Sequence, residues 1–137
     1  MDGIVGTLLD VGLKLFGLRG ELSKARQARK QQVADFLNSI GKNIEDASTS
    51  LKQGIYPHGT CQMLLTHSQQ IESSIGDLVG NQQAAELGSQ LHEVWQIERL
   101  HSELGSQPQE ERKRNLQVLD QAAGLFRATA EIVRVSP

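Results

Sequence analysis

The sequence is poor in the residues that bring covalent links, aromatic packing or sharp breaks. It has one cysteine, Cys61, which excludes an intramolecular disulfide and suits a reducing compartment. Aromatic residues make up 4% of its 137 residues, so aliphatic side chains must fill any core. Only three prolines occur, at positions 57, 108 and 137. Long stretches are therefore free of the residue that most strongly breaks helices.

Apolar residues recur at steps of three and four along almost the whole chain, which is the spacing of one helix face. We predict an all-α single domain, an antiparallel bundle of four long helices with a short amphipathic helix before it. The N-terminal helix is expected within 1–18 and the bundle within 19–137. The expected long helices are 21–53, 60–79, 81–104 and one from the start signal at 106–109 to about 133. Gly54, Gly80 and Gly105 end the first three of them.

No arrangement of reactive side chains typical of an enzyme is visible. The segment HEVWQ resembles the HExxH motif of zinc proteases, but Gln96 stands where the second histidine ligand is needed. His58, Cys61 and His67 match no standard zinc spacing, and there is no glycine-rich phosphate loop. We predict that the protein is not an enzyme and holds no cofactor and no metal.

Charge is distributed unevenly along the chain, although the formal net charge is only −2. Residues 1–30 hold six basic and three acidic residues (+3), and residues 53–111 hold one basic and eight acidic residues (−7). The basic stretch 24–30 has no aromatic residue beside it for base stacking, and the chain as a whole is acidic. We therefore expect no nucleic-acid partner.

The most apolar run is GIVGTLLDVGLKLFGL, residues 3–18, and it reads as an amphipathic helix. Sixteen residues span about 24 Å, short of a hydrocarbon core of about 30 Å, so one copy is not a transmembrane helix. Asp10 and Lys14 interrupt the run, which argues against a secretory signal. Its glycines weaken the helix in water, so it needs a partner surface, either the bundle or a membrane. The candidate membrane-insertion residues are Ile4, Val5, Leu8, Leu9, Val11, Leu15 and Phe16.

Cations lie within and just after this run, and anionic lipid head groups attract such cations by about 1 kcal/mol each. The candidate contacts to anionic lipid are Lys14, Arg19, Lys24, Arg26, Arg29 and Lys30.

The MDGIVG start, the weak apolar N-terminal helix and the long helices together resemble the fungal HeLo domain and its bacterial counterpart, the Bell domain. The segment VADFLNSIGKNIEDASTSLKQGIYPHGTCQML, followed by SSIGDLVG, is similar to the bacterial group. This resemblance implies a cell-death execution domain whose N-terminal helix targets membranes. It also implies an NLR-like upstream receptor, reached through a C-terminal amyloid motif. Nothing after Val133 resembles such a motif, so we expect the sequence to belong to a longer protein.

From these features we expect a domain that is cytoplasmic at rest and permeabilises the plasma (inner) membrane after self-association. Its expected partners are anionic lipids, further copies of itself and the upstream receptor. The alternative is a helical adaptor that binds a protein partner and uses the first helix as ordinary core. Burial separates the two: full burial of residues 4–16 favours the adaptor, and partial exposure favours the membrane effector.

Overall fold

The computed structural model describes residues 4–93 and 98–137, and every element in that part of the chain is an α-helix. The predicted all-α fold is confirmed. The helices are α1 (Ile4–Gly17), α2 (Arg19–Leu22), α3 (Gln27–Lys52), α4 (His58–Val79), α5 (Asn81–Glu93), α6 (Glu98–Gly105) and α7 (Gln109–Val135).

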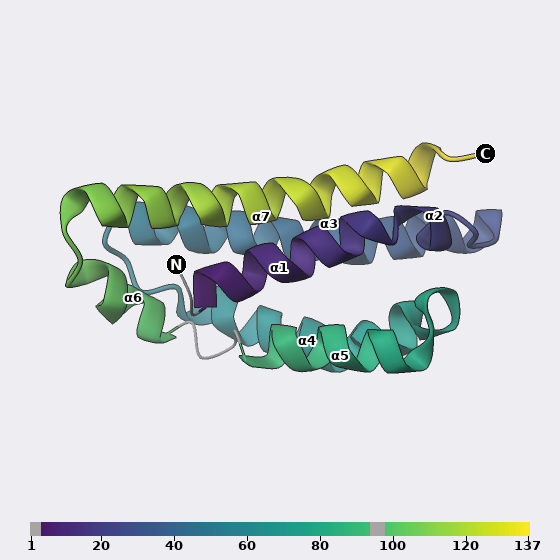
Figure 1. The fold of residues 1–137 in the computed structure, drawn as a ribbon, viewed down its shortest axis with the longest axis horizontal. Coiled ribbons are helices and arrows are strands. Elements are labelled where there is room, and N and C mark those ends of the chain that lie inside the picture. The colour runs from purple at the N-terminus through teal and green to yellow at the C-terminus, as the bar shows by residue number, and fades with distance from the viewer. Residues whose placement is uncertain (1–3, 94–97) are drawn as a thin grey trace.

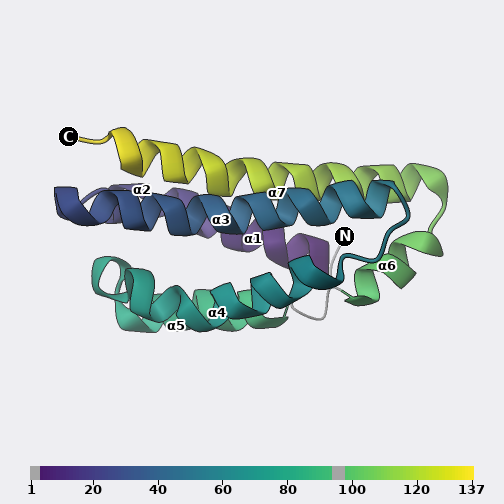
Figure 2. The same cartoon turned by 180° about the vertical axis from the view of Figure 1, so that it is seen from behind.

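Two helix pairs and one helix between them build the bundle. Figures 1 and 2 show α3 lying along α7 and α4 lying along α5, and these are the two most extensive helix contacts. The two pairs meet directly where α3 packs on α4. On the other side of the core, α1 bridges them by packing on α7 and, less extensively, on α5 (Figure 1). The N-terminal helix therefore packs across one side of the bundle, with one face in the core and the other face toward solvent.

The predicted helix 21–53 is wrong in its first part. The short helix α2 ends at Leu22 and α3 begins only at Gln27, after Arg26 adopts an extended conformation with ψ 150°. No apolar side chain between Ala25 and Val33 is buried, so the buried apolar stripe of α3 begins only at Val33. The bend still places Leu22 and Ala25 in the core.

The single helix expected over 81–104 is also replaced by two, because α5 ends at Glu93 and α6 begins at Glu98. Figure 1 shows α6 away from the line of α5, at the end of the bundle where α3 passes into α4. There the His101 ring lies 5.7 Å from the Tyr56 ring, and a His101 ring nitrogen lies 3.3 Å from the Gly54 carbonyl oxygen. Contacts with this distant turn, which local periodicity does not report, accompany the change of direction.

The predicted end of α3 at Gly54 is confirmed. Gly54 has φ +72°, a left-handed conformation that glycine adopts without steric cost. The amide of Ile55 donates to the Ser50 carbonyl over 2.8 Å, and the amide of Gly54 donates to the Leu51 carbonyl over 3.1 Å. This is the Schellman pattern of a helix C-terminus.

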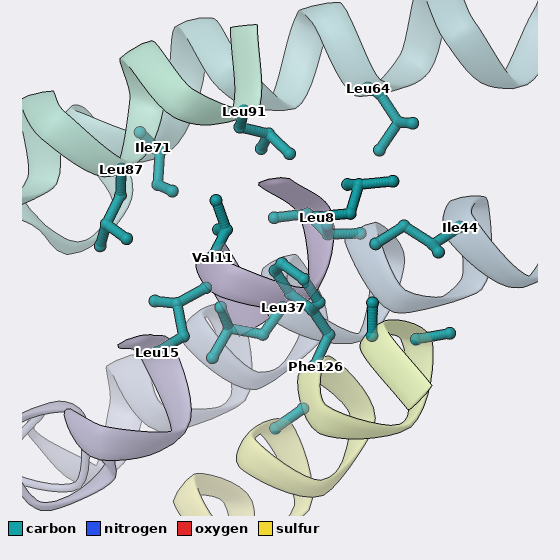
Figure 3. Packing of buried hydrophobic residues seen from close by; sticks show 14 of the residues in the cluster. Leu8, Val11, Leu15, Leu37, Ile44, Leu64, Ile71, Leu87, Leu91 and Phe126 are labelled. Carbon is teal, nitrogen blue, oxygen red and sulfur yellow. The ribbon is translucent and has the colours of Figure 1, made fainter. Parts of the chain in front are cut away.

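The core is aliphatic, as predicted, with Phe126 the largest fully buried side chain among the described residues. Most of the other core side chains are leucine, isoleucine and valine from α1, α3, α4, α5 and α7 (Figure 3).

Candidate functional site

The core-facing side of α1 fills the space between the two helix pairs. Figure 3 shows Leu8, Val11 and Leu15 lying among side chains of α3, α4, α5 and α7. All three are 0% exposed, and Val5 is 4% exposed. Four of the seven predicted membrane-insertion residues are therefore part of the hydrophobic core in this structure.

The remaining apolar residues of α1 are less completely covered. Leu9 and Phe16 are partly buried, and the side chain of Ile4 lies outside the described residues. Leu13, which the sequence prediction left out, is 53% exposed. The sequence does indicate that Leu13 belongs with Leu9 and Phe16, because residues three and four apart share one helix face. The side of α1 that carries Leu9, Leu13 and Phe16 is thus only partly covered by the bundle.

Close approach to α7 explains one of the glycines of α1. A Cβ atom built on Gly12 would lie 3.3 Å from the Cβ of Leu125 and 3.5 Å from the carbonyl oxygen of Ala122. Gly12 therefore lets the two helix backbones pack closely. By contrast, a Cβ on Gly17 would meet nothing within 4 Å.

A polar cluster ties α1 to α5. Lys14 Nζ lies 3.1 Å from Asp10 Oδ2 and donates to Gln90 Oε1 over 2.9 Å. The Gln90 side-chain amide donates to Asp10 Oδ2 over 2.8 Å. These hydrogen bonds, that from Gln90 first, hold the pKa of Asp10 below its usual range. Lys14, a predicted lipid contact, thus has partners within the protein, although its side chain is 46% exposed.

Two further predicted lipid contacts, Arg29 and Lys30, also have partners within the protein. The Arg29 guanidinium pairs with the Asp77 carboxylate and donates to the Ser74 carbonyl over 2.6 Å, which joins α3 to α4. Lys30 is only 4% exposed. Its ammonium group donates to Ser136 O, Ser136 Oγ and Pro137 O over 3.0, 2.9 and 2.7 Å.

The other three predicted lipid contacts, Arg19, Lys24 and Arg26, are exposed near the α2 end of the bundle. The Arg19 guanidinium carbon lies 4.4 Å from the centroid of the Phe16 ring, a cation–π contact, and Arg19 donates to the Phe16 carbonyl over 2.9 Å. Lys14 is exposed as well, so four of the six predicted lipid contacts have exposed side chains in this conformation.

In the described part of the chain, no three His, Cys, Asp or Glu side chains are grouped so that they could hold a metal ion. The described helices likewise include none that is both long and apolar enough to cross a membrane. Comparisons with protein-family models, curated proteins and solved structures give no match to this chain.

Proposed function

We propose that this chain is a membrane-permeabilising cell-death effector domain, with α1 stored in the bundle until self-association releases it. One observation carries the proposal: the amphipathic N-terminal helix lies between two helix pairs that also contact each other directly through α3 and α4. The two pairs therefore share a contact in which α1 takes no part. The resemblance to HeLo and Bell domains supports the same function, with a receptor acting upstream in bacterial immunity.

Release of α1 needs a compensating apolar environment. Leaving Val5, Leu8, Val11 and Leu15 in water would cost about 1.5–3 kcal/mol for each side chain. A bilayer accepts the same side chains, together with the exposed Leu13. The helix has 14 residues and is thus about 21 Å long, short of a hydrocarbon core of about 30 Å. We therefore propose that several copies act together at the inner membrane.

The burial of α1 also favours a second candidate, a helical adaptor domain. The four core residues of α1 are buried as completely as those of any other helix. Full burial of residues 4–16 is what the adaptor candidate predicts, and these four residues agree with it. The exposure of Leu13 and the partial burial of Leu9 and Phe16 agree instead with the membrane effector, which predicts partial exposure of this helix. A functional experiment must therefore separate the two candidates.

A reversible tether between α1 and α7 provides that experiment. Gly12→Cys combined with Leu125→Cys, in a Cys61→Ala background, places two Cβ atoms about 3.3 Å apart, close to the separation that a disulfide requires. We expect the oxidised protein to cause no dye leakage from anionic liposomes, and we expect reduction to restore leakage. Every predicted insertion residue stays in place, so the test isolates the release of the helix.

The matched controls are the two single-cysteine proteins in the same background, whose leakage should not depend on the reductant. The adaptor candidate predicts no leakage from the wild type or from either redox form. Leakage from the oxidised, tethered protein at the wild-type rate would show that α1 does not need to leave the bundle, and the proposed mechanism would be wrong.

A further inference from the structure

His67 of α4 lies buried at the contact that joins the two helix pairs. It is 6% exposed and faces α3, where the Phe36 ring packs edge-on at 5.7 Å between ring centroids. Its Nε2 lies 2.9 Å from the side-chain nitrogen of Asn43. Its Nδ1 is buried without a hydrogen-bond partner among the described residues.

The hydrogen bonds of Asn43 determine which protonation state of His67 fits. The Asn43 amide nitrogen also donates to the Ser39 carbonyl over 3.0 Å, which orients the amide group. Nε2 must then accept a hydrogen from Asn43, so the ring is neutral and carries its proton on Nδ1. An imidazolium would direct a second donor at Asn43, and reversal of that amide would turn its oxygen toward the Ser39 carbonyl.

We infer that His67 makes the α3–α4 junction, and so the contact between the two helix pairs, labile to mild acid. The neutral ring fits between Phe36 and Asn43, whereas the protonated ring has no acceptor there and must move toward water. The inference concerns the bundle itself and does not depend on the proposed function.

Among the described residues, no charged group offsets the effect of burial on His67. Burial alone lowers the pKa of His67 below its usual value. The titratable side chains of α4 and of the helices that contact it include Lys42, Glu45 and Asp46 of α3, Glu72 of α4, Glu86 and His92 of α5, and Glu21 of α2. None of them contributes to the shift.

The direction of the pH effect follows from the lowered pKa. The unfolded chain binds a proton at His67 below about pH 6.5, while the folded chain resists it, so stability is complete above that pH and falls as the solution is acidified. If the folded ring stays neutral, the equilibrium constant of unfolding should rise up to about 30-fold between pH 7.5 and pH 5 through this residue.

Urea unfolding of the wild type and of His67→Gln, measured from pH 5 to pH 7.5, tests the inference. We expect His67→Gln to remove most of the pH dependence that His67 contributes, of which about 30-fold is the upper limit, because glutamine does not titrate but still offers an oxygen to Asn43. His92→Gln, which alters an exposed histidine of α5, should keep the wild-type pH dependence. Identical pH dependence in the wild type and His67→Gln would overturn the inference.

A second variant gives a result of opposite sign. Asn43→Asp places a carboxylate opposite Nε2, which should favour the protonated ring and raise the pKa of His67 measured by NMR. The acid loss of stability should then shrink. If the NMR pKa of His67 in the wild type were at or above 6.5, or unchanged by Asn43→Asp, the inference would be wrong.

The reactivity of the single cysteine, Cys61, measures how far α4 becomes accessible to reagent when the α3–α4 contact opens. Cys61 lies buried on α4, 4% exposed, on the same helix as His67. Its reaction with 4,4′-dithiodipyridine, a reagent that works in mild acid, should accelerate between pH 7 and pH 5 in the wild type more than in His67→Gln. Equal acceleration in the two proteins would contradict an opening controlled by His67.

Discussion

At the scale of single residues, Lys30 shows what charge alone does not reveal. It was predicted as a lipid contact because it ends a run of cations. Yet it also stands three residues before Val33 and seven before Leu37, in line with the buried stripe of α3. The structure buries its stem and satisfies its ammonium group with oxygens of Ser136 and Pro137. The position of Lys30 in the apolar stripe of α3 indicates that it is buried. Nothing in the local sequence indicates its hydrogen-bond partners, which are 106 and 107 residues away.

Lys30→Met should therefore destabilise the protein. Methionine keeps the apolar stem but removes three hydrogen bonds, and the expected loss is about 1–2 kcal/mol in the free energy of unfolding. Lys24→Met, at an exposed cation, is the matched control and should change it by less than about 0.5 kcal/mol. Urea denaturation at pH 7 measures both. Equal effects of the two substitutions would mean that the buried hydrogen bonds add no stability.

At the scale of helices, the sequence predicted which segments are helical better than where they stop. The apolar stripes of α3, α4 and α7 and the glycine end of α3 are local signals, and these helices appear close to their expected positions. The break before Gln27 and the division of the expected helix 81–104 into α5 and α6 have no such local signal. For α1, periodicity identified the buried face but not whether protein or lipid covers it.

Two leucines of α1 should respond very differently to truncation. Leu8→Ala removes a fully buried side chain and should cost about 3 kcal/mol, because it leaves a cavity between the helix pairs. Leu13→Ala shortens a side chain that is 53% exposed and should cost less than about 0.5 kcal/mol. Thermal or urea unfolding measures the difference. A small loss for Leu8→Ala would show that α1 is only loosely held.

At the scale of the whole molecule, the six predicted lipid contacts differ in how far away their partners lie. Lys14, Arg29 and Lys30 bind partners that are 76, 45 and 107 residues away in the sequence. Arg19 contacts the nearby Phe16, and Lys24 and Arg26 are exposed. Sequence alone placed all six in one patch, since it gives the order of charges and not their partners. If the folded bundle meets anionic lipid, the exposed group should provide the attraction.

Lys24→Gln combined with Arg26→Gln should weaken binding to anionic vesicles roughly 30-fold, because each cation near such a surface contributes about 1 kcal/mol. Lys42→Gln, at an exposed cation of α3, should leave binding nearly unchanged. Vesicle co-sedimentation at low and high salt measures these affinities. Undiminished binding by the double variant would exclude the α2 end as the lipid-facing surface.

The packing of α1 against α7 also has a consequence for the newborn chain. α1 is made before every other described helix, and α7, its most extensive contact, is made after all of them. At 5–20 residues per second, the ribosome needs roughly 7–26 s to complete the residues from the start of α1 to the end of α7. During that interval the apolar face of α1 has no α7 to cover it. A segment this short that also contains Gly6, Gly12 and Gly17 forms a helix only weakly in isolation. We therefore expect α1 to become fully helical only when α7 is available to pack against it.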